Sequence, residues 1–280
     1  MIIIADCGST KTDWALCNTD GIVAQTKTQG FNPTIQESEE IYATLASELP
    51  CEFTGSAPEE IFFYGAGCAY KEANARIETA LGNIFTTKKI NIHSDLLAAA
   101  RAMCGNREGI ACIMGTGSNS CLYNGKEIVE NTPPMGYILG DEGSGANLGR
   151  QFVSDCVKKQ LPKEITDAFM AKYNLDIPTI LEKVYRTPMP NRWLAGLTPF
   201  IHEHKENSEV RAMIKQCFTQ FFKRNVMVYR HSWLPIHVIG GIGVSFAEEI
   251  KEVAESLGLS IGNITKSPMD GLVKYHCNNG

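Results

Sequence analysis

Two short turns rich in glycine and hydroxyl residues lie between apolar runs, and their composition suits the binding of phosphate. The first follows Ile2–Ala5 and reads Asp6-Cys7-Gly8-Ser9-Thr10-Lys11-Thr12; the second follows Ile110–Met114 and reads Gly115-Thr116-Gly117-Ser118-Asn119. Glycine lets the backbone approach a bulky anion, while amides, hydroxyls and a lysine can donate to phosphate oxygens. Either turn alone could be an ordinary hairpin. Together they predict that a polyphosphate is held from two sides.

The first turn also carries an acidic side chain that could hold a metal ion. Asp6 lies at the end of a buried apolar run, so we expect it to bind Mg²⁺, usually through water. The residues expected to contact phosphate are Gly8, Ser9, Thr10, Lys11, Thr12, Gly115, Thr116 and Gly117.

A third glycine-rich stretch, Ile239-Gly240-Gly241-Ile242-Gly243, follows a buried apolar run and precedes a predicted helix. The G-x-G-x-x-G spacing of a dinucleotide fingerprint is absent. We expect a platform on which adenosine lies against the backbone; a tight strand-to-helix turn without a ligand is the alternative. With the two phosphate turns, this stretch indicates ATP.

Other polar positions could serve a second substrate. Asp95 opens a predicted helix, so it could cap that helix or act as general base for a substrate hydroxyl. In Gly140-Asp141-Glu142-Gly143-Ser144-Gly145, two acids could cap the next helix or bind sugar hydroxyls, because carboxylates accept paired hydrogen bonds. Asn32 could neighbour an N-cap or offer a ligand amide.

Alternating strands and helices must position these residues. Short apolar runs predict strands, and apolar residues at helical spacing predict helices. Beyond the two hairpins, the predicted strands are Ile22–Thr26, Ile61–Tyr64, Lys89–His93, Tyr137–Leu139, Ile236–Ile239 and Ser260–Thr265. The predicted helices are Thr34–Leu49, Lys71–Leu81, Asp95–Met103, Val244–Leu257 and Pro268–His276.

The pattern of the first third restarts at Ile110, which predicts two α/β domains. We place the first at residues 1–105 and the second at residues 106–266, with a mostly helical insertion at about 145–231. The tail at about 267–280 could pack back on the first domain.

Composition excludes several classes of protein. The chain has 280 residues and a formal net charge of -5, whereas nucleic-acid-binding proteins typically carry an excess of basic residues. No apolar stretch approaches the length of a membrane span, and the first residues are typical of a strand and not of a signal peptide, so we expect a cytoplasmic protein. The ten cysteines form no CxxC pair, so we interpret them as reduced, buried apolar side chains.

The order of these motifs resembles that of the actin-like ATPase superfamily of sugar kinases, Hsp70 and actin. Within it, the chain is most similar to the N-acetylglucosamine kinase / BadF-BadG-BcrA-BcrD ATPase family. Gly115-Thr116-Gly117-Ser118-Asn119 and Gly140-Asp141-Glu142-Gly143-Ser144 carry that resemblance, and Asp95 and Asn32 fit it. It covers nearly the whole chain.

The resemblance implies two actin-like (ribonuclease H-like) α/β domains around a central cleft for ATP, Mg²⁺ and a sugar. Thr10 and Thr116 would touch phosphates, and the adenosine end would meet Gly240, Gly241, Gly243 and Ser245. The residues implied to face the sugar are Asn32, Asp95, Ser118, Asn119, Gly136 and Asp141. One departure concerns the sugar: Pro134-Met135-Gly136 stands where related kinases often have Gly-Trp-Gly.

These inferences combine into an ATP-dependent sugar kinase that phosphorylates N-acetylglucosamine at its 6-hydroxyl, with Asp95 as the base. N-acetylmuramate and glucosamine are alternative acceptors, and a homodimer is compatible with the sequence. A BadF-type activator of a dehydratase is a rival interpretation, but it needs interface cysteines for an iron–sulfur cluster. A non-catalytic sugar or nucleotide sensor is a second rival, against which the retained Asp6 and Asp95 argue.

Overall fold

The computed structural model describes residues 1–8, 11–68 and 70–277, and the chain divides into two compact units. Unit 1 comprises Met1–Arg107, Tyr123–Ile128 and Ser267–Gly280. Unit 2 comprises Glu108–Leu122 and Val129–Lys266. The last segment of the chain therefore belongs with the first, and the turn at residues 123–128 also belongs to unit 1.

A five-stranded sheet forms the centre of unit 1, in the order β3-β2-β1-β4-β5. The central strand β1 pairs antiparallel with β2 and parallel with β4, so the hairpin side of the sheet is antiparallel and the other side is parallel. The strands are β1 Ile2–Cys7, β2 Lys11–Asn18, β3 Gly21–Gln29, β4 Glu60–Gly65 and β5 Ile90–Ser94.

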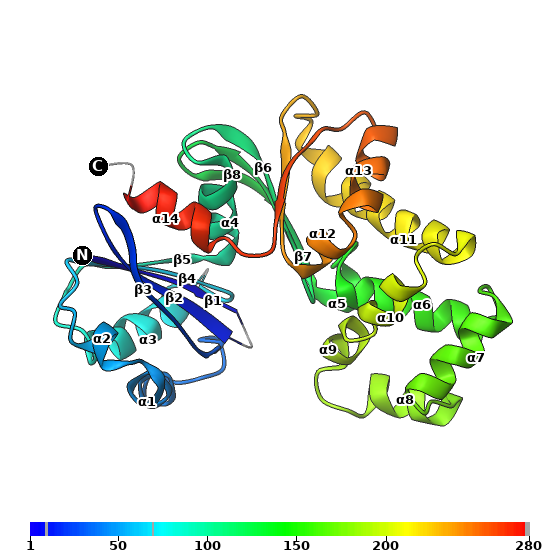
Figure 1. The fold of residues 1–280 in the computed structure, drawn as a ribbon, viewed down its shortest axis with the longest axis horizontal. Coiled ribbons are helices and arrows are strands. Elements are labelled where there is room, and N and C mark those ends of the chain that lie inside the picture. Colours follow the sequence, from blue (N-terminus) through cyan, green and yellow to red (C-terminus); the bar gives the residue numbers. More distant parts are fainter. Residues whose placement is uncertain (9–10, 69, 278–280) are drawn as a thin grey trace. The chain divides into compact units, whose positions relative to one another are not determined.

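Helices cover both faces of this sheet (Figure 1). On one face, Ile3 and Trp14 pack with Ile41 and Ile77 from the helices; on the other, Ile4 packs with residues of the last helix. The first face carries α1 Ser38–Glu48, α2 Cys51–Thr54 and α3 Lys71–Gly82, and the second carries α4 Asp95–Cys104 and α14 Met269–Cys277.

The first helix begins later than the predicted Thr34. Glu37 and Glu40 form a capping box, in which each side chain accepts a backbone N–H of the other residue, and this fixes the start of α1 at Ser38. Ile35, which the helical pattern included, is 71% exposed in the preceding turn. Capping chemistry therefore overrides the apolar spacing here.

A polar network ties α14 to the sheet of unit 1. The hydroxyl of Tyr64 lies 2.7 Å from Nε2 of His276 and accepts a hydrogen bond from Arg101 at 2.8 Å. Burial, and then the charge of Arg101, lower the pKa of His276 to about 4, so its ring is neutral at pH 7. This network fixes α14 beside α4.

The sheet of unit 2 repeats that of unit 1. Its order is β10-β9-β6-β7-β8, with β6 parallel to β9 and β9 parallel to β10, so β6, β9 and β10 take the places of β1, β4 and β5. The strands are β6 Glu108–Met114, β7 Ser118–Asn124, β8 Ile128–Thr132, β9 Ile236–Ile239 and β10 Ile261–Thr265. The predicted α/β architecture, built twice, is confirmed.

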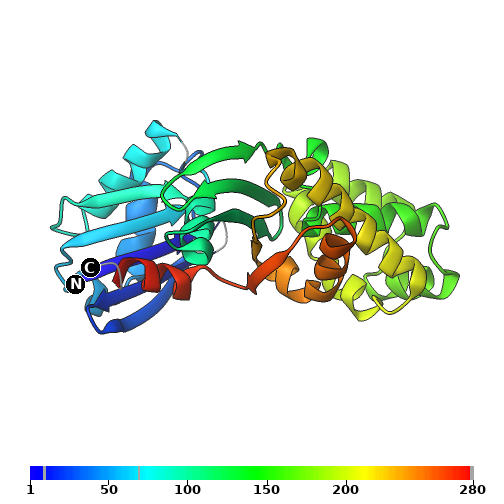
Figure 2. The same ribbon diagram turned by 90° about the horizontal axis from the view of Figure 1, so that it is seen from above.

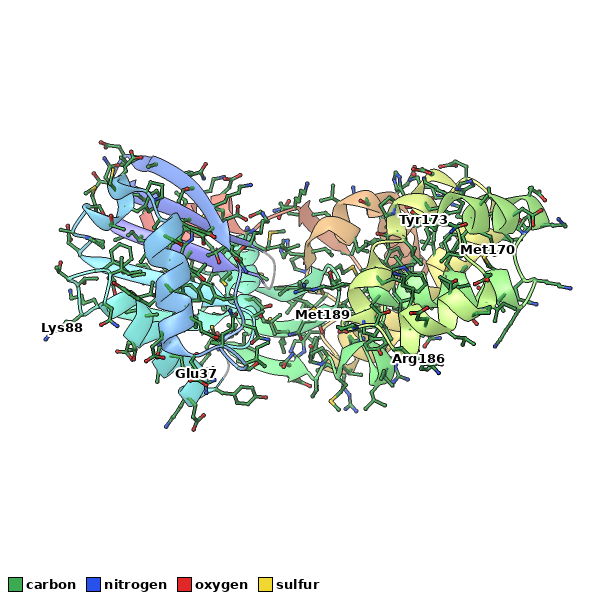
Figure 3. All side chains as sticks on the ribbon, turned by 90° about the horizontal axis from the view of Figure 1, so that it is seen from below. Glu37, Lys88, Met170, Tyr173, Arg186 and Met189 are labelled. Atoms are coloured by element: carbon green, nitrogen blue, oxygen red, sulfur yellow. The ribbon has the colours of Figure 1, made fainter. Side chains whose placement is uncertain are left out.

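The segment between β8 and β9 is helical, and Figure 2 shows these helices at one end of unit 2 with its strands at the other. Phe169 packs against Phe152 and Phe200 with ring centroids 5.1 Å and 5.5 Å apart. Figure 3 labels Met170 and Tyr173 at the end of α7. The helices are α5 Gly136–Leu139, α6 Gly145–Val157, α7 Lys163–Lys172, α8 Ile177–Tyr185, α9 Pro190–Ala195, α10 Thr198–Glu203 and α11 Ser208–Phe221, followed by a π-helix η1 Phe222–Val226 and a 3₁₀ turn η2 Met227–Tyr229.

Two predicted elements of unit 2 are wrong. Tyr137–Leu139 is no strand: it lies in the short helix α5, which follows left-handed backbone at Met135, and Ile138 and Leu139 are 68% exposed. The helix predicted over 244–257 is two helices, α12 Gly241–Ser245 and α13 Ala247–Ser256, which meet at the buried Phe246.

Eight of the ten cysteines are buried, as expected of small apolar side chains, whereas Cys51 is exposed. Within the described ranges, no group of three or more His, Cys, Asp or Glu residues is arranged to hold a metal ion. None of the helices that the structure describes is long and apolar enough to cross a membrane.

The contact between α4 and α14 depends on Gly271. A Cβ atom at this position would lie 2.3 Å from the carbonyl oxygen of Ala102. We therefore expect Gly271→Ala to lower the free energy of unfolding by about 1–3 kcal/mol in urea titrations followed by circular dichroism. Gly82→Ala is the matched control, because no atom lies within 4 Å of the methyl group that it would add and helical Ala is favoured over Gly. Equal stability of the two variants would contradict the packing described.

Candidate active site

The first glycine-rich turn, expected to bind phosphate, connects the antiparallel strands β1 and β2. The amide of Gly8 donates to the carbonyl of Lys11 at 2.9 Å, and Asp6 is paired with Asp13 across the two strands. Ser9 and Thr10, both expected to contact phosphate, lie outside the described residues. The predicted strand–turn–strand arrangement is therefore present around them.

The structure gathers three carboxylates of unit 1 near this turn. The pKa of Asp6 is raised to about 7, first because the side chain is buried and then because Asp13 and Asp95 are negative; Lys11 lowers it. Asp6 and Asp95, distant in sequence, are thus electrostatic neighbours. The described carboxylates are not arranged to ligate one metal ion together, but a divalent cation held near Asp6 through water would favour its ionised form.

Two residues of the first turn already have partners within the sheet. Lys11 Nζ donates to Oδ2 of Asp13 at 2.5 Å, so its charge is compensated. Thr12 has no exposed surface, and its hydroxyl lies 3.4 Å from the carbonyl oxygen of Gln29. Burial removes Thr12 from the surface that a phosphate could touch.

Asp95 is the first residue of α4 but is not the residue that caps it. The cap is Ser94, whose hydroxyl oxygen accepts the amide of Leu97 at 3.2 Å. Oδ1 of Asp95 accepts the amide of Leu96 at 2.8 Å, and in the described part of the chain Oδ2 has no hydrogen bond to another residue. Burial raises the pKa of Asp95. A carboxylate with a raised pKa and a free oxygen has the properties of a general base.

The side-chain oxygen of Asn32 is bonded within its own loop, whereas its NH₂ group is available to a ligand. Its Oδ1 accepts hydrogen bonds from the amide and hydroxyl of Thr34, at 3.0 Å and 2.7 Å. Oδ1 would also lie 3.0 Å from a Cβ atom at Gly67, so the loop fits closely around it. These contacts hold the side chain in one orientation, in which only the NH₂ group remains for a ligand.

The second phosphate turn is fixed by the beginning of α6. Gly115 N–H donates to the carbonyl of Gly117 at 2.9 Å, which closes the turn. The first amides of α6, those of Gly145 and Ala146, donate to the carbonyls of Gly115 and Thr116 at 2.8 Å and 3.1 Å. The unpaired amides of a helix N-terminus thus find partners in the turn, and the turn gains a rigid support.

Asp141 lies directly against this turn. Its Oδ1 accepts a hydrogen bond from the amide of Ser118 at 3.1 Å and would lie 3.0 Å from a Cβ atom at Gly117, so a side chain there would crowd Asp141. The backbone of Asp141 is left-handed (φ 55°), a strained conformation that clusters at functional sites. Burial raises the pKa of Asp141. The structure therefore brings together two residues, Ser118 and Asp141, that were expected to face the sugar.

The two other residues expected at the sugar have different surroundings. Asn119 Oδ1 accepts the amide of Ser120 and the Nδ2 group of Asn131, at 2.9 Å and 3.0 Å. Gly136 is exposed, with a left-handed backbone (φ 72°), at the start of α5. Its turn leads the chain into Gly140 and Asp141.

A cavity of about 360 Å³ in unit 2 unites the second phosphate turn with the third glycine stretch. Gly115, Thr116, Gly241 and Ser245 line it, and its volume suits a nucleoside. Gly240 makes this possible, because a Cβ atom there would lie 2.2 Å from the carbonyl oxygen of Met114. Gly240 and Gly243 do not line the cavity; Gly243 packs against Val238.

The cavity also includes residues that sequence reasoning missed. Lys266, exposed at the end of β10, lines it and has no ion pair among the described residues. Its position just after a parallel strand was the available signal, since ligands gather at the carboxyl ends of such strands. No comparable sequence signal pointed to Ala195 and Thr198, the lining residues from the helical insertion. The lining residues not predicted are Ala195, Thr198, Ile242, Val244 and Lys266.

Comparison with known proteins finds kinases of amino sugars among the similar proteins. No family model matches the chain. An N-acetylmuramic acid/N-acetylglucosamine kinase from Clostridium acetobutylicum is 25% identical over 215 residues, which are 72% of this chain and 69% of that protein.

Among solved structures, a candidate N-acetylglucosamine kinase from Porphyromonas gingivalis has a TM-score of 0.95 and 43% identity, covering 100% of this chain and 99% of that one. A candidate N-acetylglucosamine kinase from Chromobacterium violaceum, at 17% identity, shares the fold with a TM-score of 0.77 over 98% of each chain. The identity and near-complete coverage of the first structure, together with the glycine turns and carboxylates described above, show that this chain belongs to the N-acetylglucosamine kinase family of actin-like ATPases.

Proposed function

We propose that this protein transfers the terminal phosphoryl group of ATP to the 6-hydroxyl of N-acetylglucosamine. Membership of a family of sugar kinases supports phosphoryl transfer to a sugar hydroxyl. The observation that carries the proposal is the cavity in unit 2, where turns from Gly115 and from Gly241 meet. Phosphate and adenosine sites joined in this way fit ATP.

Asp95 is the proposed base. As the sugar oxygen forms its bond to the γ-phosphorus, the bond from that phosphorus to the β–γ bridging oxygen breaks, and ADP leaves. The hydroxyl proton passes to the free oxygen of Asp95. Since phosphoryl transfer depends on positioning and charge stabilisation, the rigid support of Asp95 by the capped start of α4 favours it.

Mg²⁺ is the proposed metal cofactor, with Asp6 as its protein ligand through water. The buried carboxyl of Asp6, with Asp13 and Asp95 as negative neighbours, fits such an ion. When bound with ATP, Mg²⁺ neutralises charge on the phosphates. Gly8 adds no side chain beside this position, and a Cβ atom there would lie 3.6 Å from the Lys11 carbonyl oxygen.

The proposed sugar contacts are Asp141, Ser118, Asn119, Gly136, Asn32 and Asp95. Asp141 can accept from sugar hydroxyls, and the free NH₂ of Asn32 can donate to one. Because the relative from Clostridium acetobutylicum is named for two sugars, N-acetylmuramate is the first alternative acceptor. We place the reaction in the cytoplasm, where ATP is available; a homodimer stays a prediction.

Asp95→Asn should abolish transfer and spare ATP binding. We expect kcat to fall by a factor of about 10²–10⁴, because a base is lost, while the Kd for ATP measured by calorimetry stays within about twofold. Thermal stability should not fall, since the substitution removes a buried charge. Asp20→Asn, on an exposed turn, is the control. Near-normal turnover by Asp95→Asn would exclude the proposed base.

A panel of acceptors tests the substrate. ADP release should depend on added sugar and be fastest with N-acetylglucosamine, followed by N-acetylmuramate, glucosamine and glucose. Phosphorus NMR of the product should show the phosphate on the 6-oxygen. ADP release that does not depend on any added sugar would contradict the kinase proposal. A product phosphorylated at another hydroxyl would contradict only the assignment to the 6-oxygen.

Lys266→Met tests the nucleotide cavity. A lysine that donates to a nucleotide oxygen contributes about 1.5–3 kcal/mol, so the KM for ATP should rise about tenfold or more with the sugar KM unchanged. Lys251→Met, exposed on α13 of the same unit, is the matched control. An unchanged KM for ATP would show that Lys266 only borders the cavity.

A further inference from the structure

The π-helix η1 follows the end of α11 and leads into the 3₁₀ turn η2, and two of its side chains contact the loop that carries Asp141. Its five residues, Phe222–Val226, continue directly from Phe221 at the end of α11. Single π-helical turns inside longer helices are rare and are frequent at functional sites. In this one, Arg224 and Asn225 both donate hydrogen bonds to the carboxylate of Glu142.

Asn225 is the centre of the contact. Its Nδ2 group donates to Oε2 of Glu142 at 3.1 Å, while its backbone carbonyl accepts the hydroxyls of Ser120 and Thr132 at 2.9 Å and 3.2 Å. The side chain is only 7% exposed. One buried residue thus joins β7, the end of β8 and the loop after α5.

Both oxygens of the Glu142 carboxylate are held. Oε1 accepts a hydrogen bond from Nε of Arg224 at 2.5 Å, and Oε2 accepts one from Nδ2 of Asn225. Burial by itself would raise the pKa of Glu142, but the hydrogen bonds from Asn225 and Arg224 outweigh it and lower the pKa. The side chain is therefore a fixed anion committed to η1, with both oxygens occupied by protein donors.

The contacts that hold Glu142 also restrict its neighbour Asp141. The carbonyl of Glu142 accepts the hydroxyl of Ser118 at 2.8 Å, and Asp141 accepts the amide of the same residue at 3.1 Å. The left-handed backbone of Asp141 is a strained conformation, so surrounding contacts must hold it. At Gly143 the chain passes so close to α11 that a Cβ atom would lie 2.9 Å from that of Phe221.

We propose that Asn225 is a positioning residue for the sugar: it clamps Glu142, and the clamp aims Asp141 and Ser118 at the acceptor. This inference rests on the proposed function, in which Asp141 and Ser118 face the sugar. None of the clamp residues lines the nucleotide cavity. Loss of the clamp should therefore weaken sugar binding and leave ATP binding unchanged.

Asn225→Asp tests the clamp, because it preserves shape and the backbone carbonyl but replaces the donor with a second carboxylate facing Glu142. We expect the KM for N-acetylglucosamine to rise tenfold or more, with kcat and the KM for ATP within about threefold. The double variant Asn225→Asp with Glu142→Gln restores a donor–acceptor pair and should recover most of the lost sugar affinity. Lys223→Gln, exposed on the same π-helix, is the control.

The experimental outcomes distinguish failure of the clamp proposal from failure of the proposed kinase function. A wild-type protein without sugar-dependent ADP release overturns both. An active wild type whose Asn225→Asp variant keeps its sugar KM overturns the clamp alone, as does a variant that loses stability and kcat without rescue by Glu142→Gln. If Asn225→Asp does not fold, Arg224→Gln removes the exposed half of the clamp, and an unchanged sugar KM there overturns the proposal.

Discussion

The cavity of unit 2, the proposed nucleotide site, depends on one close approach of backbone to backbone. Gly240, at the end of β9, lies so near the carbonyl of Met114, at the end of β6, that a side chain at Gly240 would meet that oxygen at 2.2 Å. The first amides of α6 then hold the adjoining carbonyls of Gly115 and Thr116. The contact at Gly240, the start of α6 and the turn at Gly115 thus support one another. Glycine here serves backbone packing as well as ligand access.

Burial and pairing together divide the buried carboxylates of this chain into those with roles in the proposed function and those that stabilise the fold. Asp6, Asp95 and Asp141 are carboxyls whose pKa is raised, mainly by burial. Glu249 is completely buried too, but Arg211 and Lys205 lie 3.1 Å and 3.2 Å from its carboxylate. An uncompensated buried acid costs stability, so its retention points to function, whereas a paired one serves the structure.

The sequence predicts most strands and helices because apolar runs such as Ile2–Ala5 and Ile110–Met114 are buried in the sheets. It fails where local chemistry decides: the capping box at Glu37 shortens α1, and the left-handed backbone at Met135 turns Tyr137–Leu139 into a helix. At the candidate site, the turns and Asp95 follow from residue type and spacing. The burial of Thr12, the lining role of Lys266 and the contacts of the π-helix depend on segments distant in sequence, which no local pattern encodes.

The return of α14 to unit 1 has a consequence for synthesis on the ribosome. Ile4, Ala15 and Tyr64 pack against Leu272 and Val273, and His276 bonds to Tyr64. All of unit 2 is translated between these partners. The part of this sheet face that α14 covers therefore stays exposed beside α4 while the whole second unit emerges, and nascent chains would offer it to a chaperone until α14 leaves the exit tunnel.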